Sequence, residues 1–356
     1  MPTESPSQSA DAPSPFRSVN SSGFAGLLEH LRISLLVTTY QAGKLMAIRG
    51  RDGRVSTLLR SFERPMGLAV RDLREFALGT RHQVWHFRNA PDIAAQIGPA
   101  GTHDACFLPR SSHVTGDIRC HEMAWVGEEL WIVNTFFSCL CSTSPTFSFI
   151  PRWSPQFLPD PSPGDHCHLN GLAVRDGKPC YVTALGESKV PEGWRPAKAT
   201  GGIILDVASG AIVSAGLSMP HSPRWHAGQL WVLESGLGQL QTVDLDTGKR
   251  TTVAQLPGYT RGLAFSGPFA FVGLSKIREN KTFGNLPITR SGAELQCGIW
   301  VVDLRSNQIA QFMKFETGVE EIFAVEVLEG VHFPEIVGFQ DDTINGAFVV
   351  PPKGHA

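Results

Sequence analysis

The sequence lacks the segments and motifs that identify several large classes of protein. No run approaches the 18 apolar residues expected of a membrane-spanning helix. The motifs GxGxxG, GxxxxGK[ST], HExxH and GxSxG are also absent, which disfavours a nucleotide-binding enzyme, a zincin and a serine hydrolase. An excess of one charge is missing too, because 31 Lys and Arg nearly balance 33 Asp and Glu. We therefore expect no nucleic acid and no membrane among the partners.

Cysteine is present without a recognisable pairing pattern. The chain has seven cysteines, an odd number, and no CxxC pair with zinc-finger spacing. The residues after Met1, PTESPSQSADAPSPF, lack the basic start and the apolar stretch of a secretory signal. We expect reduced thiols and a cytoplasmic location. Cys120 and Cys167 each precede a histidine. Side chains of a strand alternate between its two faces, so each cysteine should lie on the face opposite to that of its neighbouring histidine. Thiolate ligation of a soft metal is therefore the less favoured alternative.

Glycine and proline are frequent, and strand patterns dominate. The chain holds 36 Gly and 25 Pro, which predicts many turns. Residues 1–20 are rich in Ser, Pro and Ala, and we expect a disordered tail there. Residues 23–31 could form one short helix, and short strands separated by turn residues follow. With 42% hydrophobic residues the chain can bury a core, and we predict a single all-β domain over residues 21–350.

A short apolar strand recurs six times along the chain. Its copies read MGLAV, HEMAWV, NGLAV, SPRWHA, RGLAF and EIFAVEV, and each is followed by a second strand. They recur about every 50 residues, the size of one propeller blade. Residues 33–62 add strands without an inner partner, and the last copy, near 321–327, lacks outer strands. The pattern predicts a six-bladed β-propeller closed by N-terminal outer strands and a C-terminal inner strand; two β-sandwiches are the alternative. Stretches near 90–118 and 142–167 read as inserted loops that cover one face as a lid.

One position of the recurring strand is polar in five of the six copies. The residues three places before its centre are Met66, His121, Asn170, Ser222, Arg261 and Glu321. Inner strands of a propeller surround a channel, so these side chains should converge at its mouth. His168 and Tyr259 lie two residues earlier on the same faces, and His221 lies one residue from the set. The sequence predicts a polar ring that is suited to metal binding or acid–base chemistry.

The leading prediction for this ring is a metal-dependent enzyme. His121, His168 and His221 are the expected ligands of a divalent transition metal, Zn, Fe or Cu, with Glu321 as a fourth ligand or a neighbour of the ligands. The alternative is that the histidines only form hydrogen bonds around a water-filled channel.

Further polar residues would complete the site. The expected catalytic residues are Glu122, Asn170, Tyr259, Arg261 and Glu321, of which Glu122 or Glu321 would transfer a proton. The expected substrate-binding residues are Arg224, Arg261 and Arg278, because Arg binds carboxylate or phosphate in a planar, bidentate way. Salt bridging is the alternative for each arginine.

The predicted substrate is a small polar, anionic molecule that undergoes hydrolysis or elimination, with oxidation as the second choice. A non-catalytic propeller that binds a protein or glycan is the alternative function, and the sequence does not define the oligomeric state.

Several phrases of the chain are distinctive. FFSCLC, HCHLNGLAV, MPHSPRWHAGQLWVLESG, PGYTRGLAF and VGLSKIRE resemble an uncharacterised bacterial family, some of whose members carry tetratricopeptide repeats. The resemblance runs from about residue 22 to residue 335 and implies a propeller-like all-β domain without a named reaction. The architecture is more distantly similar to gluconolactonase-type hydrolases, to which Asn170 and Glu321 correspond, and to the peptide-amidating lyase, to which the three histidines correspond. Both analogies imply a metal at the channel mouth.

Overall fold

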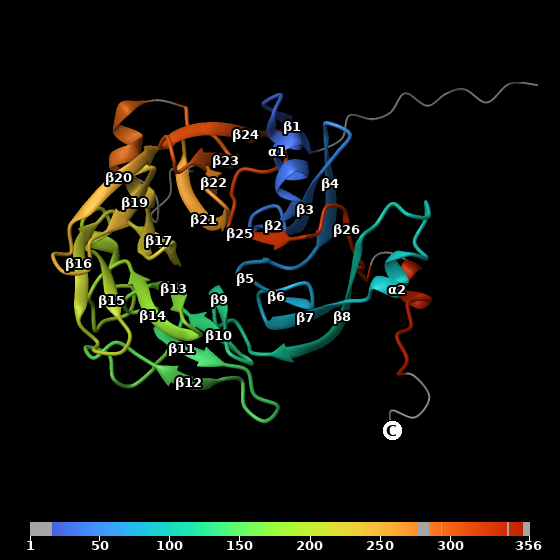
Figure 1. Ribbon diagram of the computed structural model, residues 1–356. Coiled ribbons are helices and arrows are strands. Elements are labelled where there is room, and N and C mark those ends of the chain that lie inside the picture. Colours follow the sequence, from blue (N-terminus) through green and yellow to red (C-terminus); the bar gives the residue numbers. More distant parts are fainter. Residues whose placement is uncertain (1–15, 277–284, 293, 340–341, 352–356) are drawn as a thin grey trace, which may run out of the picture.

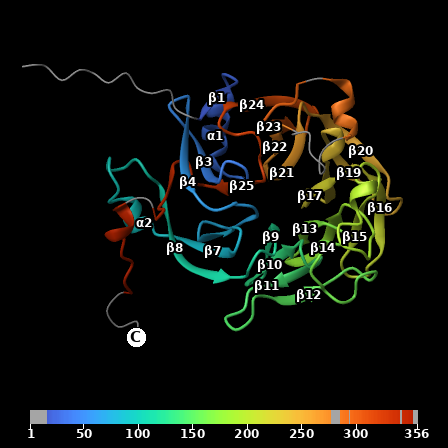
Figure 2. The same cartoon turned by 180° about the vertical axis from the view of Figure 1, so that it is seen from behind.

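The strands of the protein form a ring of separate sheets. The computed structural model describes residues 16–276, 285–292, 294–339 and 342–351. Within these ranges lie six sheets arranged around a central axis (Figure 1), and Figure 2 shows the same ring from behind. The innermost strand of each sheet contacts the innermost strands of both neighbouring sheets. The predicted six-bladed β-propeller is confirmed.

The blades are numbered by the chain order of their innermost strands. Blade 1 contains β5 (Leu68–Arg71), β6 (Glu75–Gly79), β7 (Gln83–Asn89), β8 (Ala105–Val114) and β26 (Pro334–Ile336). Blade 2 contains β9 (Cys120–Val126), β10 (Glu129–Asn134), β11 (Cys139–Ser142) and β12 (Ile150–Trp153). Blade 3 contains β13 (Leu169–Arg175), β14 (Lys178–Ala184), β15 (Gly202–Asp206) and β16 (Ile212–Leu217). Blade 4 contains β17 (Pro220–His226), β18 (Gln229–Glu234), β19 (Gln239–Val243) and β20 (Arg250–Gln255). Blade 5 contains β21 (Tyr259–Ser266), β22 (Phe269–Ser275), β23 (Gly298–Asp303), β24 (Gln308–Thr317) and β1 (Arg17–Asn20). Blade 6 contains β25 (Ala324–Glu329), β2 (Ile33–Thr39), β3 (Lys44–Arg51) and β4 (Arg54–Ser61).

The α-helices of the described residues are α1 (Phe24–Leu31) and α2 (Pro91–Ala94). The short 3-10 helices are η1 (Arg195–Ala197), η2 (Ser235–Leu237), η3 (Pro287–Ser291) and η4 (Asp342–Asn345).

Blade 6 joins the early and late parts of the chain. Its innermost strand β25 pairs antiparallel with β2, and Ala324 stands opposite Thr38. The Thr38 hydroxyl donates to Met66 O at 2.6 Å and accepts from Ala324 N at 3.1 Å, which ties blade 6 to blade 1. The predicted closure by N-terminal outer strands and a C-terminal inner strand is therefore confirmed. Closure removes the open sheet edge that an unclosed ring would expose.

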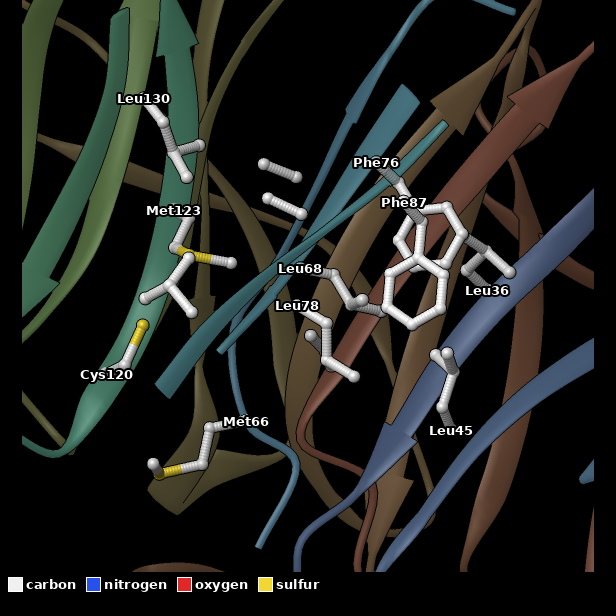
Figure 3. Close-up of a cluster of buried hydrophobic side chains, with 14 of the residues drawn as sticks. Leu36, Leu45, Met66, Leu68, Phe76, Leu78, Phe87, Cys120, Met123 and Leu130 are labelled. Atoms are coloured by element: carbon white, nitrogen blue, oxygen red, sulfur yellow. The ribbon is translucent and has the colours of Figure 1, made fainter. Parts of the chain in front are cut away.

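Hydrophobic side chains fill the space between neighbouring blades. Figure 3 shows the cluster to which blades 6, 1 and 2 contribute, with Leu36 and Leu45 beside Phe76 and Phe87. The rings of Phe76 and Phe87 stack with centroids 4.6 Å apart. Each fully buried Leu or Phe contributes about 1.5–3 kcal/mol. This packing fixes the inner strands around the axis.

The expectation of a disordered tail over residues 1–20 is wrong for its last residues. Arg17–Asn20 form β1, which pairs antiparallel with β24 at the outer edge of blade 5. The pairing satisfies backbone groups of β24 that would otherwise form an open edge, and Arg17 forms an ion pair with Glu316 at 3.0 Å. Residues 1–15 lie outside the described residues. The short helix expected over residues 23–31 is present as α1.

The two stretches expected as inserted loops contain strands of the blades. β8 lies within residues 90–118 and β12 lies within residues 142–167, so neither stretch is a loop as a whole. Pro109 and the polar residues after it interrupt the apolar pattern of β8, which explains the error. No helix among the described residues is long and apolar enough to cross a membrane.

Candidate functional site

A cavity of about 530 Å³ opens at the end of the ring where the innermost strands begin. Its size falls within the range of small-molecule sites. The predicted residues that line it are Met66, His121, His168, His221, Tyr259, Arg261 and Glu321. The fold thus brings together three histidines that are about 50 residues apart in the chain.

The local backbone geometry orients the side chains of the three histidines toward the cavity. Arg119, His168 and Met219 immediately precede inner strands and have φ of +52°, +51° and +48°, a left-handed conformation that is uncommon for residues other than glycine. Each of the strands that follow has a β-bulge near its start. In β17 the bulge lies between His221 and Arg224, and the intervening Ser222 also has a positive φ of +48°. A bulge re-aims neighbouring side chains, which explains why His221 faces the cavity against simple alternation.

His121 and His221 are held in the same way. The Nδ1 of His121 donates to Arg119 O at 3.1 Å, and the Nδ1 of His221 donates to Met219 O at 3.0 Å, in each case two residues back. Burial holds the pKa of both imidazoles well below the usual value, and the nearby Arg261 charge lowers both further. Both rings are therefore neutral at pH 7, with Nε2 left to meet a ligand.

His168 pairs with a buried carboxylate. Its Nδ1 donates to the two oxygens of Asp165, at 3.0 and 2.9 Å. Asp165 is 1% exposed and also accepts from Arg119 Nη1 at 2.8 Å. Asp165 and His168 both have positive φ, and backbone strain of this kind concentrates at functional sites. The pairing fixes the Nδ1–H tautomer and leaves Nε2 of His168 able to accept a proton.

Arg261 brings a buried positive charge to the cavity wall. Its guanidinium lies 3.4 Å from the centroid of the Phe323 ring, and its Nη1 lies 3.6 Å from Glu321 Oε1. Burial lowers the pKa of Arg261, whereas the Glu321 charge raises it. Nη2 is enclosed and has no hydrogen-bond partner among the described residues. A buried donor without a partner costs about 1–3 kcal/mol, so the site favours negative charge nearby.

Tyr259 lies beside His221. Its hydroxyl is 3.4 Å from His221 Nδ1, which also lies 2.9 Å from Ser235 Oγ. Burial raises the pKa of Tyr259, so its phenol stays protonated at pH 7 and can donate a hydrogen bond or a proton.

Glu122 and Arg224 were expected at the site beside the ring but do not line the cavity. They form a buried ion pair further along the inner strands, and Arg224 Nη2 also lies 3.3 Å from Glu326 Oε1. Glu122 Oε2 accepts a hydrogen bond from Leu172 N at 3.0 Å. These three charged residues come from β9, β17 and β25, which belong to alternate blades, so the triad connects three blades across the axis. The expected position of Glu122 and Arg224 at the cavity is therefore corrected, because the two side chains pair with each other inside the channel.

Asn170 also lies outside the cavity. It is 3% exposed, its Nδ2 donates to Pro220 O at 3.0 Å, and its Oδ1 accepts from Thr183 Oγ1 at 2.6 Å. It ties blade 3 to blade 4, which corrects its expected position in the ring at the channel mouth. Arg278, expected to bind substrate, lies outside the described residues.

The sequence analysis missed other residues that line the cavity or hold a residue that lines it. Asp165 has a signal, because it stands three residues before His168. Arg64 and Arg119 occupy the place two residues before the ring position of their repeats, so the repeat alignment could have located them. Lys276, which also lines the cavity, follows a strand of blade 5 and has no comparable signal.

Metal ligation is not evident from side-chain placement. Among the residues that the structure describes, no group of three or more His, Cys, Asp or Glu side chains is placed to hold one ion. The seven cysteines are free thiols. Burial raises the pKa of Cys120 and Cys167 to about 12, so both remain protonated and apolar in character.

The fold and the cavity together define a six-bladed β-propeller with a histidine-lined mouth. The chain belongs to the family described as a domain of unknown function (DUF4915), which matches residues 22–337. Among solved structures, a chain of the crystal structure of a Nidogen/Laminin complex is similar, with a TM-score of 0.51 over 84% of this chain and 99% of that chain. At 9% sequence identity this similarity shows the fold alone. The search of curated proteins finds no match.

Proposed function

We propose that the protein is an enzyme that uses His168 to take a proton from a small anionic molecule, or from water beside it, in the cavity. The observation that carries the proposal is the Asp165–His168 pair, in which the imidazole is fixed through Nδ1 by a buried carboxylate. In such a pair Nε2 accepts the proton and the carboxylate stabilises the imidazolium that forms. Hydrolysis and elimination both begin with a transfer of this kind.

The charges around the cavity support an anionic substrate. The basic lining residues are Arg64, Arg119, Arg195, Arg261 and Lys276, and the acidic ones are Asp117, Glu320 and Glu321. An excess of basic groups attracts anions and stabilises negative charge that develops during the reaction. Protonated Tyr259 is placed in the same cavity and would supply a proton to a leaving group.

The test is conversion of small molecules by the purified protein. The protein is incubated with a small-molecule extract of cells, and mass spectrometry follows which anionic compounds disappear. We expect the wild-type protein to convert at least one compound, and Asp165→Asn and His168→Gln to slow its conversion by about 10²–10⁴-fold. His30→Gln, which changes an exposed histidine, is the matched control and should convert it at the wild-type rate. Equal rates in all four proteins would refute the role of the pair. An extract that the wild-type protein leaves unchanged would favour the non-catalytic propeller.

A metal-dependent reaction is the second candidate, and one observation favours it. The rings of His121 and His168 meet edge to face with centroids 4.7 Å apart. Two imidazoles that bind one ion through Nε2 at about 2.0–2.1 Å place their centroids at a similar separation, about 5 Å. Their Nδ1 atoms are both held by protein acceptors, as in many metal-ligating histidines.

Elemental analysis of protein purified without added metal separates the two candidates. Near-stoichiometric Zn, Fe or Cu that disappears in the double variant His121→Ala, His168→Ala would support the metal enzyme. Metal-free protein that retains full conversion would exclude it.

A further inference from the structure

The charged side chains around the cavity differ in whether they already have a partner. The pairs are Asp117 with Arg81 at 3.4 Å, Arg119 with Asp165 at 2.8 Å, Arg195 with Glu192 at 2.9 Å, and Arg261 with Glu321 at 3.6 Å. Arg64 and Lys276 line the same cavity, and neither has a carboxylate within ion-pair distance in the part of the chain that the structure describes. Two basic groups at the cavity are therefore available for a ligand.

These two groups lie at a different depth from Arg261. Arg261 is 7% exposed and packs on Phe323 in the wall of the cavity. Arg64 is exposed to solvent, with its guanidinium 5.8 Å from the centroid of the Tyr40 ring, and Tyr40 lines the cavity as well. Lys276 is half-buried. Positive charge is therefore present both in the inner wall and at the mouth of one cavity.

We propose that the ligand of this cavity carries two separate anionic groups, each a carboxylate or a phosphate. One group is bound near Arg261, and the other is bound at the mouth by Arg64 and Lys276. The inference deepens the proposed function, because it names the class of substrate that the same site takes. Guanidinium and ammonium groups both bind such anions, Arg in a planar fork and Lys as a point charge. The chain that joins the two anionic groups would then pass the imidazoles that line the cavity.

Calorimetry with simple probes tests the second anionic group. Glutarate and pentanoate have the same number of carbon atoms and differ in one terminal carboxylate, and 4-phosphonobutyrate replaces one carboxylate of glutarate by a phosphonate. We expect the wild-type protein to bind glutarate at least tenfold more tightly than pentanoate at low salt. The advantage should shrink at high salt, because salt screens charges near the surface. The phosphonate probe identifies which anion the mouth prefers.

Variants locate the second group. In the double variant Arg64→Ala, Lys276→Ala, the affinity for glutarate should fall to that for pentanoate, and the affinity for pentanoate should stay unchanged. The double variant Arg74→Ala, Lys178→Ala removes two exposed charges away from the cavity and should retain the wild-type preference. Circular dichroism and thermal unfolding confirm that both double variants fold.

The outcomes separate this inference from the proposed function. Equal affinity of the wild-type protein for glutarate and pentanoate, or a preference that survives in the Arg64, Lys276 double variant, would overturn the two-anion inference. The proposed function would then still stand on the conversion test with Asp165→Asn. If Asp165→Asn converts the compound as fast as the wild-type protein does, the proposed function is overturned, while the preference for glutarate over pentanoate is unaffected.

Discussion

The triad of Glu122, Arg224 and Glu326 makes the stability of the propeller depend on pH. Burial raises the pKa of Glu326 to about 7 from an unfolded value of 4.5; the Glu122 charge adds to the shift and Arg224 opposes it. The folded protein therefore holds this proton more tightly than the unfolded chain. The stabilisation that the folded protein gains from the protonated Glu326 is fully present below pH 4.5 and is lost as the pH rises through about 7.

The size of the effect follows from the shift. Each pKa unit corresponds to about 1.4 kcal/mol, so the free energy of unfolding falls by at most about 3 kcal/mol through this group. The side chain of Glu326 is 21% exposed, so solvent reduces this value only in part. Glu326→Gln keeps the shape of the protonated side chain and removes the titration. The variant should match the wild-type protein near pH 4.5 and be more stable at pH 8.

Urea unfolding at a series of pH values measures the difference. The expected result is a stability difference between Glu326→Gln and wild type that grows by up to about 3 kcal/mol between pH 4.5 and pH 8. Glu316→Gln, at a partly exposed ion pair with Arg17, is the control and should show a much smaller change. A Glu326→Gln difference that does not change with pH would refute the reasoning.

Three further results are expected. Phe76→Ala should lower the free energy of unfolding by about 3–5 kcal/mol, because Phe76 is fully buried in the cluster of Figure 3; a loss below about 1 kcal/mol in urea unfolding would contradict that packing. Deletion of residues 1–20 should lower the thermal midpoint relative to deletion of residues 1–15, because only the longer deletion removes β1 from the edge of β24; equal midpoints in calorimetry would show that β1 contributes nothing. Cys120 and Cys167, fully buried with pKa of about 12, should react with a maleimide only after unfolding; rapid labelling of either thiol in the folded protein, detected by mass spectrometry, would contradict their placement.

The ring of six blades could be predicted from the sequence because each repeat contains short strands of recognisable composition. Six inner strands of similar composition at nearly even spacing leave few architectures that bury them all, and the unpartnered strands at residues 33–62 point to closure with the last copy. The tail was less predictable. Arg17–Asn20 have no apolar pattern, and their pairing with β24 depends on an edge that only the folded blade creates.

The candidate site was predictable in outline and not in every residue. His121, His168, His221 and Arg261 could be found because the repeat places them at the same end of their strands. Glu122 was expected at the cavity because it adjoins His121, whereas it lies further inside the channel, where a β-bulge near the start of β9 interrupts strand alternation. The pairing of that carboxylate with Arg224 joins residues about 100 positions apart, which no local pattern reveals.

The central claim is that the histidine-lined cavity at the start of the inner strands holds an anionic small molecule beside His168. A crystal structure of the protein grown with the compound that the conversion test identifies, or with glutarate, tests it most directly. The account predicts ligand density in this cavity, with one anionic group near Arg261 and part of the molecule within hydrogen-bond distance of His168 Nε2. Ligand bound only at the opposite end of the ring or on the outer blades would contradict the account.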